Sequence, residues 1–137
     1  MITKKIKCTN YNNEEVEEVA YFNLTKPELI DIEVSIAEGV EDFLKKVLKN
    51  NDRKSMIDFF KTLIFKSYGV KSEDGRRLIK SAALSEEFSQ TEAYSTLFME
   101  LFTDQKAAET FLKGIMPKDI EFNEEAIQAK IAELSNS

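Results

Sequence analysis

Four glutamates, Glu14, Glu15, Glu17 and Glu18, form the densest group of side chains that could do chemistry. Paired carboxylates act as general acid and base when burial shifts the pKa of one of them. These four lie beside a turn-like asparagine pair on an alternating segment, where acidic side chains are normally solvated. We therefore interpret them as surface charge and not as a catalytic pair.

The remaining residues offer little other material for catalysis. The chain has no histidine, which excludes Ser-His-Asp and Cys-His catalysis and any histidine-ligated metal site. Its single cysteine, Cys8, cannot form a disulfide within the chain. The loop Lys71–Gly75 fails the calcium-loop pattern, because Val70 stands where that pattern needs an acid. We expect a protein that is not an enzyme and has no cofactor and no metal, with carboxylate chemistry the one catalytic route left open.

The charge balance is acidic, with 25 acidic and 19 basic residues and a net charge of −6. Negative charge repels phosphate, so no nucleic acid is expected as a partner. A basic spot at Gly75–Arg77 and Lys80 is interpreted as surface charge on a loop, with a contact to an acidic partner as the alternative. The apolar run inside Met56–Phe65 is far shorter than the roughly 20 residues that span a bilayer. Because Met1–Lys7 also lacks the apolar centre of a secretory signal, we expect a cytoplasmic protein that does not enter a membrane.

The elements that carry these residues begin with a β-hairpin. Apolar and polar residues alternate loosely over Ile2–Thr9 and again over Val16–Phe22, and Asn10–Glu14 between them is rich in turn residues. A hairpin alone is marginal in water, so its apolar face must lie against the rest of the domain.

Helices are predicted from Thr25 onward. Thr25–Glu28 has the pattern of a capping box, which starts a helix at Lys26 that runs to about Glu38. A second helix begins at Val40 and ends at Asn50–Asn51, and Asp52 caps a third that reaches Tyr68. We interpret the glycines as ends of helices, because they are too far apart for a phosphate loop: Gly39, Gly69, Gly75 and Gly114.

Three further helices are predicted before the end of the chain. Ala82–Phe88 is a short helix behind Ser81, and Ser89–Glu92 is a second capping-box pattern that opens the next one. Asp104 caps a helix that ends at Gly114 and Pro117. The predicted fold class is α+β, mainly α: an N-terminal β-hairpin followed by a compact bundle of about five to six helices. We expect a single domain over 1–137, made of the hairpin (2–24), a helical core (25–117) and a C-terminal amphipathic helix with its tail (118–137).

Some apolar residues do not fit the buried stripe of their own helix. On a helical wheel Phe65 projects nearly opposite the buried side of its helix, Met99 lies off the stripe of the next long helix, and Phe102 lies at its edge. Ile127 and Ile131 form a narrow stripe in the last helix. Either another helix of the domain covers these side chains, or a partner protein binds them. They are our candidate partner-binding residues, and the surplus apolar surface also predicts a homo-oligomer.

Several stretches of the sequence resemble a known family. They are the opening hairpin with Tyr21–Leu29, then Ser67–Arg77, then Phe88–Tyr94 with Leu97–Leu101 behind it, and Phe111–Pro117. In this order on one short chain they resemble the tail assembly chaperones of bacteriophages with long non-contractile tails (siphophages) and of prophages of Gram-positive bacteria. The likeness covers about Ile2 to Pro117.

The resemblance implies a role in building the phage tail. Such a chaperone binds the tape measure protein, keeps it soluble, helps recruit subunits of the tail tube protein, and is absent from the mature virion. It works in the cytoplasm of the host bacterium, often together with a frameshifted longer isoform of itself. The alternatives are a structural tail or head-completion protein of the phage particle, or a small acidic bacterial adaptor or secretion chaperone.

Overall fold

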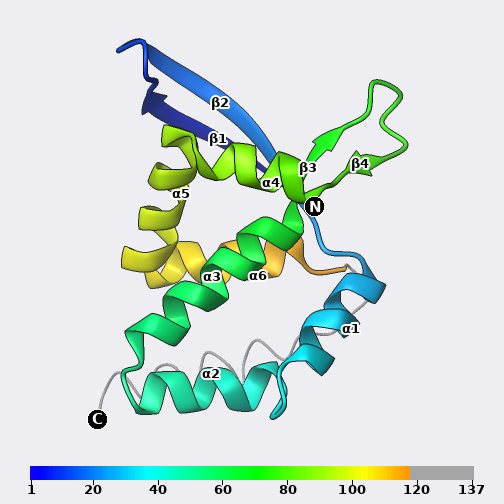
Figure 1. The fold of residues 1–137 in the computed structure, drawn as a ribbon, viewed down its shortest axis with the longest axis vertical. Coiled ribbons are helices and arrows are strands. Elements are labelled where there is room, and N and C mark those ends of the chain that lie inside the picture. Colours follow the sequence, from blue (N-terminus) through cyan, green and yellow to red (C-terminus); the bar gives the residue numbers. More distant parts are fainter. Residues whose placement is uncertain (118–137) are drawn as a thin grey trace.

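A β-hairpin opens the fold, as the alternating sequence predicts. The structure is a computed structural model that describes residues 1–117, and its first strands are β1 (Ile2–Thr9) and β2 (Glu15–Phe22) (Figure 1). The turn between them is held by the Asn10 side chain, whose oxygen accepts hydrogen bonds from two backbone N–H groups of the turn. Asn13 takes a left-handed conformation with φ 61°, which asparagine adopts more readily than most residues.

Two short strands extend the hairpin into an antiparallel sheet of order β1-β2-β3-β4. β3 (Tyr68–Lys71) pairs with β2 on one side and with β4 (Leu78–Ile79) on the other. The helix predicted to reach Tyr68 is present and ends at Ser67, with Tyr68 as its C-cap, but Gly69 is a strand residue and not the stop of that helix. Gly69 lies within β3 for a packing reason, since a Cβ there would lie 2.5 Å from Cγ of Leu78. The predicted surface turn after Gly69 is the loop of this second hairpin.

Six helices follow the first hairpin within residues 1–117, so the fold is mainly α with a smaller β part, as predicted. In Figure 1, α3 crosses the middle of the molecule from α2 at the bottom to α4 near its upper end, with α1 on the right and α5 on the left. The helices are α1 (Lys26–Ser35), α2 (Val40–Lys49), α3 (Arg53–Ser67), α4 (Ala82–Ser89), α5 (Glu92–Thr103) and α6 (Gln105–Ile115).

Four of the predicted helix caps are confirmed in atomic detail, one of them Ser81, which caps α4 by accepting from the Leu84 N–H. The capping box of α1 is complete, because Thr25 Oγ1 accepts from the Glu28 backbone N–H and Glu28 Oε1 accepts from the Thr25 N–H. Asp52 and Asp104 cap α3 and α6 by accepting from backbone N–H groups of the first turn. Each cap satisfies donors that a helix start otherwise leaves unpaired.

Two predicted helix boundaries are wrong. The cap of α5 is Thr91, which accepts from the Tyr94 N–H, and not Ser89, which is still helical and donates to the carbonyl of Glu86 in its own α4. Helix α1 ends at Ser35 and not near Glu38. Serine and threonine hydroxyls bond to nearby backbone either forward as caps or backward into a helix, so the hydroxyl pattern alone does not choose between them.

The core lies where the hairpin meets α3, α4, α5 and α6. Phe22 at the end of β2 is fully buried, and its ring contacts those of Tyr68, Phe88 and Phe111 at centroid distances of 5.8, 5.9 and 5.2 Å. Helix α6 ends at Ile115, between Gly114 and Pro117 as predicted, and a Cβ on Gly114 would come within 2.8 Å of the Ile2 side chain. The absence of a side chain there lets α6 approach the first strand.

The predicted C-terminal helix of residues 118–137, with Ile127 and Ile131, lies outside the described residues. The single domain over 1–137 accordingly stays a prediction. Among the helices of residues 1–117, none is long and apolar enough to cross a membrane.

Candidate protein-binding surfaces

The densest group of side chains that could do chemistry lies on the surface of the structure. Glu14, Glu15, Glu17 and Glu18 are all exposed, as surface charge should be. No group of three or more histidine, cysteine, aspartate or glutamate side chains in this part of the chain could hold a metal ion.

Cys8 is also poorly placed as a nucleophile. Desolvation first, and then the carboxylates of Glu18 and Glu92, raise the pKa of its thiol above the ordinary value. The reactive form of cysteine is the thiolate, and a raised pKa lowers its fraction at neutral pH.

The structure instead forms a line of aromatic rings, which we call the aromatic row: the exposed Phe65 of α3 and, on α5, the half-buried Tyr94 and Phe98 and the exposed Phe102. Neighbouring ring centroids in this order are 6.1, 6.0 and 6.0 Å apart. The three rings of α5 are spaced i, i+4 and i+8, which places them on one face of the helix. The row therefore joins two helices that are far apart in sequence.

Three of the predicted partner-binding residues lie at or beside this row. Phe65 and Phe102 belong to it and are 38% and 37% exposed. Met99 is 51% exposed and lies three residues before Phe102, on the adjoining face of α5. The sequence analysis did not identify Tyr94 and Phe98 as candidates; both are half-buried and pack against the core.

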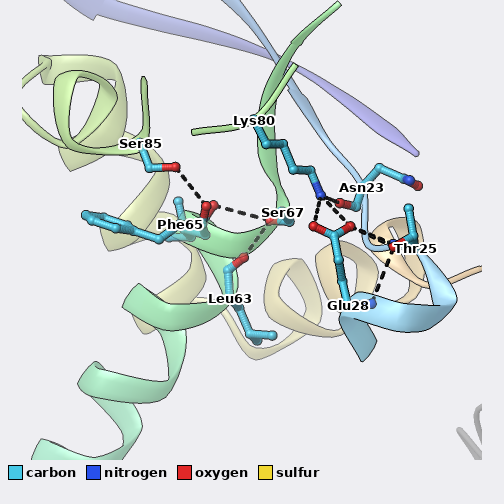
Figure 2. A network of polar contacts seen from close by, with 9 residues as sticks. Asn23, Thr25, Glu28, Leu63, Phe65, Ser67, Lys80 and Ser85 are labelled. Carbon is cyan, nitrogen blue, oxygen red and sulfur yellow. Dashed lines mark hydrogen bonds and ion pairs between the residues drawn. The ribbon is translucent and has the colours of Figure 1, made fainter. Parts of the chain in front are cut away.

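Residues of α4 and β3 support the aromatic row. The Phe88 ring of α4 meets Tyr94 edge-on at 5.8 Å and stacks on Tyr68 at 4.3 Å. Figure 2 shows the Ser85 hydroxyl of α4 donating to the carbonyl of Phe65 at 2.8 Å, which ties the end of α3 to α4. Burial raises the pKa of Tyr94, so its hydroxyl stays neutral. The row is thus an apolar surface on a rigid support.

A second apolar surface lies on another side of α3, and we call it the α1 groove. It has a volume of about 280 Å³ between α1, α2, α3 and α6. Its only charged lining residue among those described is Glu33, and its apolar lining comprises Leu29, Ile30, Ile32, Val40, Leu44, Phe59, Leu63, Leu112 and Met116. No stretch of sequence predicted this groove, because its walls come from four helices.

The α1 wall of this groove is held mainly by polar contacts at its two ends. Figure 2 shows Lys80 Nζ reaching both carboxylate oxygens of Glu28 at 2.7 and 2.8 Å and the carbonyl of Asn23 at 2.5 Å. At the other end the Glu33 carboxylate accepts from the Val40 N–H at 3.3 Å. Only Ile32 of α1 is buried. Lys80 was predicted to belong to a basic spot on the surface, but its ammonium group makes contacts within the protein.

Comparison with known proteins gives one finding about the whole chain. A family model described as phage tail assembly chaperone matches residues 1–136. Neither the curated proteins nor the solved structures contain a significant match. The matched range includes the hairpin, the aromatic row and the α1 groove.

Proposed function

Because this chain belongs to the phage tail assembly chaperone family, we propose that it binds the tape measure protein and keeps it soluble while the tail is built. It does so by protein binding alone, in the cytoplasm of the host bacterium. It helps recruit tail tube subunits and is released before the virion is complete.

The aromatic row is the observation that supports this binding role. A long helical partner shows an apolar stripe to water, and an exposed apolar surface covers such a stripe without a specific hydrogen-bond pattern. Aromatic side chains and methionine are common anchors of such contacts, since they bury a large area at a small entropic cost. Phe65 and Phe102 are already ordered by ring contacts within the row, which reduces that cost further.

The narrower parts of the proposal come from the family resemblance. They are a tail of the long non-contractile type, a longer frameshifted form of the same chain, and assembly of several copies along one tape measure protein. Several copies on one long partner gain affinity through multivalency. Sedimentation of the purified protein at high concentration tests self-association, and a sharp monomer contradicts it.

Co-expression with the tape measure protein of the same gene cluster tests the proposal. We expect the unmodified chain to keep that protein in the soluble fraction. The variant Phe65→Ser, Met99→Gln, Phe102→Ser should lose this activity with an unchanged circular dichroism spectrum. A matched control, Val19→Thr, Val34→Thr, Val70→Thr, removes three other exposed apolar residues and should keep it.

Three results would count against this assignment. If the row variant unfolds, its side chains belong to the core. If it folds and still solubilises the partner, binding occurs elsewhere. If the unmodified chain neither binds nor solubilises the tape measure protein of its own gene cluster, the proposed partner is wrong.

A further inference from the structure

The aromatic row spans two helices, and within residues 1–117 one ring pair joins its two parts. Phe65 of α3 meets Tyr94 of α5 at a centroid distance of 6.1 Å and an interplanar angle of 75°. The three rings that belong to α5 keep their spacing through that helix. The shape of the row therefore depends on where the last turn of α3 lies relative to α5.

The last turn of α3 is held in part by another helix. The chain continues from Ser67 directly into β3, and the final carbonyls of a helix lack partners within it. The carbonyl of Ile64 accepts from the Tyr68 N–H, which caps the helix. The carbonyl of Phe65 accepts from the Ser85 hydroxyl of α4 at 2.8 Å (Figure 2). Helix α4 is thus bonded to the residue that carries the first ring of the row.

Ser85 is buried, with 5% of its surface exposed, and lies inside α4. Alanine forms helices more readily than serine and buries no hydroxyl, so the stability of α4 alone does not account for a serine here. A serine in a helix commonly bonds back to a carbonyl of its own helix, as Ser89 does to Glu86. The Ser85 hydroxyl instead donates to a different helix. Its hydrogen bond therefore serves the contact between α3 and α4.

The same side of α4 also supports the α5 part of the row. Phe88 lies three residues after Ser85, so the two side chains leave neighbouring positions on one face of the helix. The Phe88 ring meets Tyr94 edge-on at 5.8 Å. One short helix thus contacts Phe65 through a hydrogen bond and Tyr94 through a ring, and it fixes the position of each relative to the other.

We propose that Ser85 is a positioning residue of the aromatic row, whose hydrogen bond holds Phe65 against Tyr94 so that the rings form one continuous surface. This inference rests on the proposed function, in which the row binds the tape measure protein. A binding surface that already has its bound shape loses less entropy on binding, and it keeps that shape through bonds to the residues that support it. Loss of the hydroxyl should move Phe65 and weaken binding although every ring of the row is still present.

Removal of the hydroxyl tests the proposal in the full-length protein. Nuclear Overhauser effects between ring protons report whether two rings are in contact. In Ser85→Ala the effect between Phe65 and Tyr94 should be lost, whereas that between Tyr94 and Phe98, which share α5, should remain. On co-expression with the tape measure protein, the yield of that protein in the soluble fraction should fall by about threefold or more.

Three further variants separate positioning from general stability. Ser89→Ala removes a hydroxyl that bonds within α4, and Lys80→Met removes a donor that holds α1; neither should change the Phe65–Tyr94 effect or the yield. Ser85→Cys keeps a side chain of similar shape with a weaker donor, so both readouts should lie between those of the unmodified protein and Ser85→Ala. The cysteine variant also provides the test if Ser85→Ala does not fold.

The proposal is wrong if the Phe65–Tyr94 effect is unchanged in Ser85→Ala, because the bond then does not position the ring. It is also wrong if the effect is lost and solubilisation is complete, since the position of Phe65 then does not matter for binding. Equal losses of yield in Ser85→Ala and Lys80→Met would assign the loss to stability and contradict positioning. If the unmodified chain does not solubilise the tape measure protein, the proposed function fails, and the ring contact alone then supports or contradicts the positioning of Phe65 by Ser85.

Discussion

The aromatic row and the α1 groove are both apolar and both use α3, yet they are built differently. The row consists of rings that contact one another and rest on Phe88 and Tyr68. The groove has aliphatic side chains on a wall, α1, that contributes one buried residue and is tied at its ends by Lys80 and Glu33. We therefore expect the row to keep its shape when a partner binds and α1 to shift more easily. A fixed surface favours binding at low entropic cost, and an adjustable one accepts partners that differ in shape.

The largest effect should come from the core that supports the row. Phe22→Ala is expected to lower the free energy of unfolding by about 3 to 5 kcal/mol, because a buried ring in contact with three others is replaced by a cavity. Phe102→Ala in the row should cost only about 1 kcal/mol, since that ring is partly exposed. Denaturant unfolding of both variants measures the difference. Equal costs would show that the row is part of the core.

A second change should disturb the groove more than the row. Gly114→Ala places a Cβ 2.8 Å from Cδ1 and 2.9 Å from Cβ of Ile2, so α6 must move away from β1 at a cost of about 1 to 3 kcal/mol. Leu112 and Met116, which lie on either side of Gly114, line the groove. We expect a lower free energy of unfolding while the tape measure protein stays soluble on co-expression. Loss of this solubilising activity in a folded variant would contradict the separation of the two surfaces.

Removing the cation that holds α1 should have a smaller effect on stability. Lys80→Met leaves Glu28 and the Asn23 carbonyl without their shared donor and should cost about 1 to 2 kcal/mol. Hydrogen exchange should increase in α1 and stay unchanged in α5. Equal protection of α1 in the variant and the unmodified protein would mean that the Lys80 contact does not hold this wall.

The smallest predicted effect is a pH dependence at the same contact. Burial opposes ionisation of Glu28, but its bonds to Lys80 and Thr25 outweigh burial and lower its pKa below the ordinary 4.5. Its carboxylate therefore stabilises the fold above that value, and this contribution is lost as the pH falls through the folded pKa. The stability difference between the unmodified protein and Glu28→Gln should shrink from about pH 7 to about pH 3. If this stability difference does not change with pH, the ion pair between Glu28 and Lys80 does not contribute to stability.

Features that depend on neighbouring residues in the sequence could be predicted. The first hairpin and the caps at Thr25, Asp52 and Asp104 are confirmed, because each depends on side chains that bond to nearby backbone. Strand β3 could not be predicted, since its pairing with β2 joins Tyr68 to Phe22, which is far away in sequence.

The sequence also predicted only part of the two apolar surfaces. The helical wheel identified Phe65, Met99 and Phe102 as residues away from the buried stripe, and the structure shows them exposed. It could not show that Phe65 meets α5 through Tyr94, nor that four helices enclose a groove, because both depend on how helices pack. Ile127 and Ile131 lie outside the described residues, and their partner-binding role stays a prediction.

The methionines allow one direct measurement of where the tape measure protein binds. The chain has four, of which Met99 adjoins the aromatic row, Met116 lines the α1 groove, and Met1 and Met56 serve as references. With methyl-labelled methionine, addition of the tape measure protein should shift or broaden the NMR signal of Met99 and leave that of Met116 in place. A tape measure protein that binds without changing the Met99 signal would contradict the assignment of the aromatic row as its binding surface.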